Sequence, residues 1–267
     1  MNFPLFPAIN TPFRAIQTGR RYIWPNLKCW VSWIFTSRAD ANFTYAITDG
    51  CKINLAASVA SILNVPYSEV ADYFAEIEND ESFKHHLARL WESHPERYRT
   101  DDNQSIGRRM VWYAIARIRK PKLIVETGVD QGLGATVLCA ALMRNSTQGH
   151  PGRYYGTDIN PKAGFYLQEP FSKHGEILYG DSIESLRKLE GPIDLFINDS
   201  DHSAEYEAAE YEVVKRKLSQ SAIILGDNSH VTSKLAEFSV REGRKFVFLS
   251  EEPKDHWYRG AGVGISV

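Results

Sequence analysis

The 267-residue chain has few of the features typical of secreted or membrane-spanning proteins. It contains three cysteines, Cys29, Cys51 and Cys139, and their odd number and spacing suit neither a disulfide framework nor a metal site. Residues 1–10 have no charged region followed by an apolar core, so we expect no signal peptide. These absences predict a reducing compartment, most simply the cytoplasm.

An excess of charge of one sign is also missing. The formal net charge is -2 and no run of Lys and Arg stands out, so a nucleic-acid partner is not expected. The apolar segment Cys29–Phe35 is far shorter than the roughly 20 residues that span a bilayer. Arg14, Arg20, Arg21 and Lys28 precede it, which keeps contact with a membrane surface open. We favour packing of this segment against the following domain or a second subunit.

The chain divides near residue 104. Residues 1–104 are predicted to be a helical extension or cap, and apolar side chains repeat at helical spacing over Leu55–Leu63, Val70–Ile77 and Phe83–Trp91. Ser68 is the expected N-cap of the second of these helices. The polar segment His94–Asn103 is the expected linker. Apolar N-terminal helices also favour a homodimer.

Residues 105–267 alternate between helix and strand patterns. Strands are expected at 123–125, 154–157, 176–179, 193–197, 222–225, 245–249 and 261–267. Helical patterns separate the first six strands, whereas the segment 250–260, with Pro and Gly, joins the last two. The fold class is therefore α/β and Rossmann-like, with a mostly parallel seven-stranded sheet that ends in an antiparallel hairpin.

The first strand of this domain leads into a helix through a turn that carries Gly128, Gly132 and Gly134. Glycines let the backbone pass close to a ligand at the start of a helix, so the turn favours a nucleotide-like ligand. The dinucleotide fingerprint places its first two glycines two residues apart, and this spacing is missing. NAD is therefore not expected.

Glu-x-Gly-x-x-x-Gly after a strand, in a seven-stranded sheet with a closing hairpin, resembles motif I of the class I S-adenosylmethionine-dependent methyltransferases. The resemblance covers roughly residues 106–267. It implies cofactor contacts at five positions of the turn, Glu126, Thr127, Gly128, Gly132 and Thr136. These relatives commonly have Ser or Thr where this chain has Gly134. Thr136 or the backbone amides at the start of the helix are expected to take over that contact.

Carboxylates at the ends of the next strands extend this resemblance. Asp158 ends the second strand, where the family binds the ribose hydroxyls. Asp181 and Ser182 follow the third strand, where the family binds the adenine. Each acidic residue also has an alternative role as a helix cap. Asp199, after the fourth strand, is a further expected cofactor contact.

The fourth and fifth strands are neighbours in this fold, so Asp199, Asp227 and Asn228 are expected to converge. Three oxygen ligands suit Mg²⁺ or Mn²⁺. The set resembles the metal ligands of the catechol-type and caffeoyl-CoA-type O-methyltransferases. Asp201 is an alternative ligand to Asp199.

His202 lies three residues beyond Asp199, where the catechol-type enzymes have a catalytic Lys, and is therefore the candidate base. The alternative is that His202 only caps a helix or orients Asp199. His230 is a second candidate base, and Tyr206 is expected on the substrate side.

Together these features predict a divalent-metal-dependent O-methyltransferase that uses S-adenosylmethionine. The run DSDHSAEYE and the closing WYRGAGVGISV resemble bacterial glycan and natural-product methyltransferases, which implies a hydroxyl of a small polar acceptor. Trp24, Trp30, Trp257 and Tyr258 are candidates for stacking on such an acceptor. A metal-independent N- or O-methyltransferase and a non-catalytic S-adenosylmethionine-binding protein remain open as alternatives.

Overall fold

The computed structural model describes residues 11–39, 44–101 and 105–267. Its sheet contains the strands β1 (Leu123–Thr127), β2 (Arg153–Asp158), β3 (Gly175–Tyr179), β4 (Ile193–Asn198), β5 (Leu218–Asp227), β6 (Phe246–Ser250) and β7 (Gly262–Ser266). The strand order is β3-β2-β1-β4-β5-β7-β6. The pairs among β1 to β5 are parallel, and β7 is antiparallel to both β5 and β6. The predicted fold class, with its closing hairpin, is confirmed.

The register aligns the carboxyl ends of the four central parallel strands. Thr127 pairs with Thr157 and Asn198, and Asn198 pairs with Gly226. The residues that end or follow these strands therefore meet at one edge of the sheet. They are Gly128, Asp158, Asp199 and Asp227.

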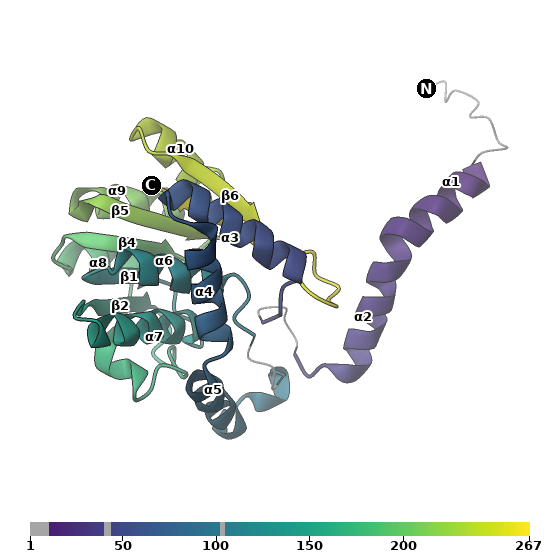
Figure 1. Ribbon diagram of the computed structural model, residues 1–267, viewed down its shortest axis with the longest axis horizontal. Coiled ribbons are helices and arrows are strands. Elements are labelled where there is room, and N and C mark those ends of the chain that lie inside the picture. The colour runs from purple at the N-terminus through teal and green to yellow at the C-terminus, as the bar shows by residue number, and fades with distance from the viewer. Residues whose placement is uncertain (1–10, 40–43, 102–104) are drawn as a thin grey trace.

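Both faces of the sheet are covered by helices (Figure 1). Ile124 packs into one apolar cluster and Val125 into the other, as expected for the two-residue period of a strand. Helices α6 (Arg109–Arg119) and α7 (Leu133–Thr147) cover the first face, and α8 (Ser182–Lys188), α9 (Ala204–Val214) and α10 (Lys234–Arg241) cover the second. Burial on both faces explains why the central strands read as nearly continuous apolar runs.

Three helices before this domain follow the three predicted apolar stripes. They are α3 (Asp49–Leu63), α4 (Tyr67–Glu78) and α5 (Glu81–Ser93). Thr48 and Asp80 cap α3 and α5, because each side chain accepts the backbone N–H three residues further on. The expected cap at Ser68 is wrong, since α4 already begins at Tyr67 with Pro66 as its N-cap residue.

Helices α3 to α5 share an apolar core with the sheet domain. Val59 and Phe74 belong to the same cluster as Trp112 of α6. The backbone also joins the two parts, because Ile47 forms a β-bridge with Pro253. The domain boundary near residue 104 stays a prediction. The expected linker contains the 3-10 turn η2 (Arg97–Arg99), and residues 102–104 lie outside the described part of the chain.

Residues 11–36 form an N-terminal arm that projects away from the domain (Figure 1). The arm consists of α1 (Thr11–Thr18), the π-helical turn η1 (Gly19–Ile23) and α2 (Trp24–Thr36). It does not pack along the domain, although the Trp33 ring meets the Trp257 ring edge-on at 5.4 Å. The other expected packing, against a second subunit, stays a prediction. In the described part of the chain, no helix is both long and apolar enough to cross a membrane.

Candidate active site

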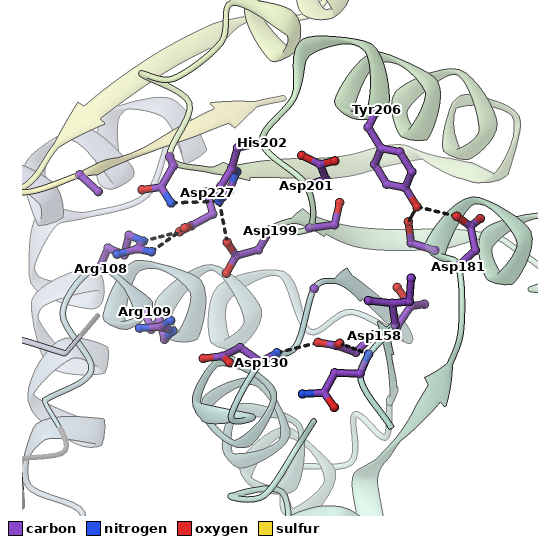
Figure 2. A pocket seen from close by; sticks show the side chains of 18 of the residues that line it. Arg108, Arg109, Asp130, Asp158, Asp181, Asp199, Asp201, His202, Tyr206 and Asp227 are labelled. Atoms are coloured by element: carbon purple, nitrogen blue, oxygen red, sulfur yellow. Dashed lines mark hydrogen bonds and ion pairs between the residues drawn. The ribbon is translucent and has the colours of Figure 1, made fainter. Parts of the chain in front are cut away.

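A cavity of about 640 Å³ lies at the carboxyl ends of the central strands (Figure 2). Open parallel sheets generally bind ligands at this edge. Eleven residues named from the sequence line it: Gly128, Asp158, Asp181, Ser182, Asp199, Asp201, His202, Tyr206, Asp227, Asn228 and Tyr258. Tyr45, Arg108, Arg109 and Asp130 also line it and were missed. Trp24 and Trp30 lie on the arm, so their expected stacking role at this cavity is not supported.

Gly128 is required by the close approach of β1 and β4. Its φ is +79°, and a Cβ added there would lie 2.0 Å from the carbonyl oxygen of Asp199. The two segments are also joined by a hydrogen bond of 2.8 Å from the Asp199 N–H to the carbonyl of Thr127. A side chain at position 128 would therefore force these strand ends apart.

The absence of a hydroxyl at position 134 has a steric cause. A Cβ on Gly134 would lie 2.7 Å from Oε1 of Glu126 and 2.7 Å from the Trp112 ring. Gly132, the N-cap residue of α7, lies against the backbone of Gly164 and has a φ of +89°. The buried Glu126 side chain thus occupies the space that Ser or Thr at position 134 would need.

Of the five expected cofactor contacts in the turn, only Gly128 lines the cavity; Gly132 lies against Gly164, and the other three side chains lie behind the turn. Glu126 accepts a 2.5 Å hydrogen bond from the Tyr154 hydroxyl, and burial raises the pKa of Glu126 to about 8. The Thr127 hydroxyl donates to Glu210, and the Thr136 hydroxyl donates to the carbonyl of Gly132. The side chains at positions 126, 127 and 136 therefore support the turn from behind, and their direct contact with a cofactor stays a prediction.

Asp158 fixes the shape of the turn through backbone amides. Its carboxylate accepts the N–H groups of Val129 at 3.0 Å, Asp130 at 2.8 Å and Asn160 at 2.8 Å. A carboxylate has about four acceptor sites, so one remains for a ligand in the cavity. The capping role and the ligand role can therefore coexist at this residue.

Asp181 and Ser182 are held by side chains of α9 at the other end of the cavity. Asp181 caps α8 by accepting the N–H of Glu184, which lowers the pKa of Asp181, and it also accepts the Tyr206 hydroxyl. Ser182 donates to Glu210 and lies 2.9 Å from the Tyr206 hydroxyl. Tyr206 thus lies on the side of Asp181, away from the position expected for an acceptor (Figure 2).

Asp199, His202 and Asp227 form a cluster at the ends of β4 and β5. Each offers a possible ligand atom, and these atoms lie within 4.8 Å of one another. Nε2 of His202 is 3.8 Å from Oδ1 of Asp199 and 3.2 Å from Nδ2 of Asn228. Asp201 is exposed and instead accepts the N–H of Ser203. The structure therefore favours Asp199 over Asp201 as a ligand.

Arg108 is the main residue that the sequence reasoning missed. It donates to both carboxylate oxygens of Asp227, and its Nη1 lies 3.5 Å from Oε2 of the buried Glu251. Glu251 also accepts the Tyr45 hydroxyl at 2.7 Å. One sequence signal existed, because Arg108 and Arg109 stand at the start of α6, where the helix dipole disfavours positive charge.

The pKa values of the two aspartates shift in opposite directions. Burial alone would raise the pKa of Asp227, but the adjacent Arg108 guanidinium holds it below its ordinary value. Burial and the neighbouring negative charge of Asp227 raise the pKa of Asp199 well above its usual range. The charged form is thus favoured at Asp227 and disfavoured at Asp199.

The two remaining candidates, Asn228 and His230, differ in how they lie relative to the cluster. Asn228 has a φ of +52°, and its amide nitrogen faces the His202 ring. His230 does not line the cavity, and its ring centroid lies 6.3 Å from that of Phe248. The geometry therefore favours His202 over His230 as a base.

The strand order, the glycine turn after β1 and the cavity over the strand ends define the class I methyltransferase fold. Residues 125–229 match the family model described as a methyltransferase domain. Residues 125–229 therefore form a methyltransferase domain, and the domain has the class I methyltransferase fold. No curated protein matches the chain.

Three solved bacterial structures with this fold are described as a putative O-methyltransferase, an O-methyltransferase and a methyltransferase. A putative O-methyltransferase from Klebsiella pneumoniae has a TM-score of 0.53 and 16% identity, with 68% of this chain and 88% of that chain covered. The O-methyltransferase TomG from Streptomyces achromogenes has a TM-score of 0.52 and 14% identity over the same shares. A methyltransferase from Geobacter sulfurreducens has a TM-score of 0.51 and 18% identity, with 68% and 90% covered. At these identities the likeness concerns the fold.

Proposed function

We propose that this protein transfers the methyl group of S-adenosylmethionine to a hydroxyl oxygen of a small polar acceptor, such as a sugar, a glycan or a natural product, with Mg²⁺ or Mn²⁺ bound beside the reacting groups. One observation carries this proposal. Two carboxylates and an imidazole converge at the ends of β4 and β5, and the glycine turn of β1 lines the same cavity. A methyl donor on the turn would thus lie next to ligands for a cation and a candidate base.

The cofactor half of the cavity supports S-adenosylmethionine. The turn at Gly128 presents its backbone to the cavity, and Asp158 keeps an acceptor site for a ribose hydroxyl. Asp181 and Ser182 follow β3, which is the neighbour of β2, and they line the same cavity as Asp158. An adenine next to the ribose would therefore lie beside them. TomG, which shares this fold, is described as a complex with S-adenosylmethionine.

The donor set fits a divalent cation. Asp199 faces the buried, charged Asp227, and a cation between them would relieve this repulsion. Arg108 already donates to both oxygens of Asp227, so a metal would use the remaining lone pairs of that carboxylate. Asp199, Asp227 and Asn228 would then hold the ion, and His202 would stay free to act as the base. When bound, it would lower the pKa of an acceptor hydroxyl.

His202 is the proposed base. Its imidazole is partly exposed to the cavity, and Asp199 and Asn228 restrict its ring from two sides. An imidazole in this position can accept a proton from a hydroxyl that is aligned with the sulfonium methyl. Tyr45 and Tyr258 line the cavity near Arg108 and offer ring faces and hydroxyls to a sugar-like acceptor.

The proposal is tested by chelation and by the substitution Asp227→Asn, with a panel of hydroxylated acceptors and S-adenosylhomocysteine affinity as a second readout. We expect EDTA treatment to reduce methyl transfer by about two orders of magnitude or more and Mg²⁺ to restore it, because hydroxyl activation depends on the cation. Asp227→Asn should lose turnover to a similar extent and keep cofactor affinity within about threefold, because Asp227 ends β5, which is separated from β1 and its turn by β4.

His202→Asn provides the matched variant. It should lose turnover while its Mg²⁺ affinity stays close to that of the unmodified protein, if His202 acts as base and not as ligand. Turnover that survives chelation would favour the metal-independent N- or O-methyltransferase. Cofactor binding without transfer to any acceptor in the panel would favour a non-catalytic S-adenosylmethionine-binding protein.

A further inference from the structure

The N-terminal arm differs in charge from the rest of the chain. Residues 11–36 contain four basic and no acidic residues, although the whole chain has a net charge of -2. The basic residues are Arg14, Arg20, Arg21 and Lys28. The arm is therefore a cationic segment attached to an acidic domain.

The arm also leaves large apolar side chains without a covering surface. Phe13 is 68% exposed and Phe35 is 83% exposed. The other exposed large apolar side chains of the arm are Ile16, Tyr22, Ile23, Trp24, Leu27, Trp30, Val31 and Ile34. A soluble domain rarely presents so many apolar side chains on one projecting helix, so this surface is expected to have a partner.

Within α2 the apolar side chains follow one stripe. Trp24, Leu27, Val31 and Ile34 are spaced by three, four and three residues, which places them on one face of a helix. Lys28 lies on the flank of this stripe. Upstream, η1 sets two arginines directly before Tyr22 and Ile23. Basic residues beside a stripe rich in Trp and aliphatic side chains are typical of helices that lie in a membrane interface.

We propose that the arm binds flat on an anionic lipid bilayer, with its apolar stripe among the acyl chains and its basic residues at the lipid headgroups. The charge of the arm favours this partner over a second copy of the chain. Two arms packed face to face would bring eight basic residues together, four from each copy, without one acidic residue to compensate them. Anionic headgroups supply the missing negative charge.

The base of the arm is fixed to the domain beside the cavity. The Ser37 hydroxyl and the Arg38 N–H donate to the Asp101 carboxylate at 2.6 and 2.7 Å. Trp33 contacts Trp257, and the neighbouring Tyr258 lines the cavity. A bound arm would therefore hold the cavity near the membrane and not at the end of a free tether.

The test is flotation of the full-length protein with phosphatidylcholine vesicles, prepared with and without phosphatidylglycerol. We expect binding to the anionic vesicles, weak binding to the neutral ones and release by high salt. The triple substitution Arg20→Gln, Arg21→Gln, Lys28→Gln should weaken binding by about fivefold for each charge removed. These side chains are exposed on the arm, so the melting temperature should not change.

Two controls make the result specific. Lys84→Gln, Lys173→Gln and Lys188→Gln remove the same charge from exposed positions of the domain and should leave vesicle binding unchanged. The triple substitution Leu27→Ser, Val31→Ser, Ile34→Ser should abolish binding. Equal binding to neutral and anionic vesicles, or no binding to either, overturns the proposal. The proposal also fails if the unmodified protein does not bind vesicles but is a dimer in light scattering, and if the Leu27, Val31, Ile34 triple variant is a monomer.

Discussion

The two halves of the cavity are built by different physical means. On the side of β1 and β2, the shape comes from backbone geometry, because Gly128 admits the β4 segment and Asp158 accepts three backbone N–H groups. On the side of β4 and β5, side-chain charges determine the arrangement. There Arg108 links Asp227 to Glu251, and Asp199 faces Asp227.

This difference shows which kind of change each half can tolerate. The β1 and β2 side, which we call the steric half, should lose its shape when a side chain adds volume, since backbone atoms cannot move aside at low cost. The β4 and β5 side, which we call the electrostatic half, should lose stability when a charge is removed, since the remaining charges are left buried without a partner. The halves also suit their proposed ligands. A methyl donor needs a fixed position, whereas a reacting hydroxyl needs groups that accept a proton and stabilise charge.

The largest effect is expected in the steric half, from Gly128→Ala. Its matched control is Gly149→Ala, because the two glycines have φ values of +79° and +83° but no atom lies within 4 Å of a Cβ at position 149. Gly149→Ala should cost about 1 kcal/mol in the free energy of unfolding and leave the affinity for S-adenosylhomocysteine unchanged. Gly128→Ala should cost more than about 3 kcal/mol and reduce that affinity by at least about a hundredfold.

Chemical denaturation and calorimetry measure both quantities. Equal losses in the two glycine variants would show that only backbone conformation matters, and the steric description of this half would be wrong.

The second prediction concerns Arg108 in the electrostatic half. Arg108→Met leaves Asp227 and Glu251 buried without a cation and should reduce the free energy of unfolding by about 3 to 5 kcal/mol. Mg²⁺ should recover part of this loss, and should stabilise this variant more than the unmodified protein. Arg109→Met is the matched control, since Arg109 also lines the cavity but Nε of its guanidinium makes no hydrogen bond.

Denaturation curves with and without Mg²⁺ provide the measurement. Arg109→Met should cost less than about 1 kcal/mol. If both variants lose the same stability, the pairing of Arg108 with Asp227 does not hold this half together.

The sequence could predict the features that depend on local pattern. The seven strands follow from short apolar runs, and Asp199 and Asp227 follow from the rule that parallel strands end at one edge. Gly134 departed from the family pattern, and its reason is tertiary, since Glu126 and Trp112 fill the space beside it. No local pattern reveals which buried group will occupy a given volume.

Long-range pairing was the second limit. Arg108 lies 119 residues from Asp227 in the sequence, so their ion pair is created only by the packing of α6 against the end of β5. The position of the arm was the third limit. From the sequence, the apolar residues of the arm would be expected to be buried. In the structure the domain does not cover them.

The smallest effect is expected from Glu126→Gln, which tests whether the steric half depends on charge at all. Burial raises the pKa of Glu126 from 4.5 to about 8, so between these values folding takes up a proton and stability falls as pH rises. From pH 6 to pH 8 the glutamine variant should lose about 2 to 3 kcal/mol less than the unmodified protein. Glu190→Gln, at an exposed position, should leave the pH dependence unchanged. Parallel stability curves for all three proteins would mean that Glu126 is already ionised in the folded state, and that charge acts on both sides of the cavity.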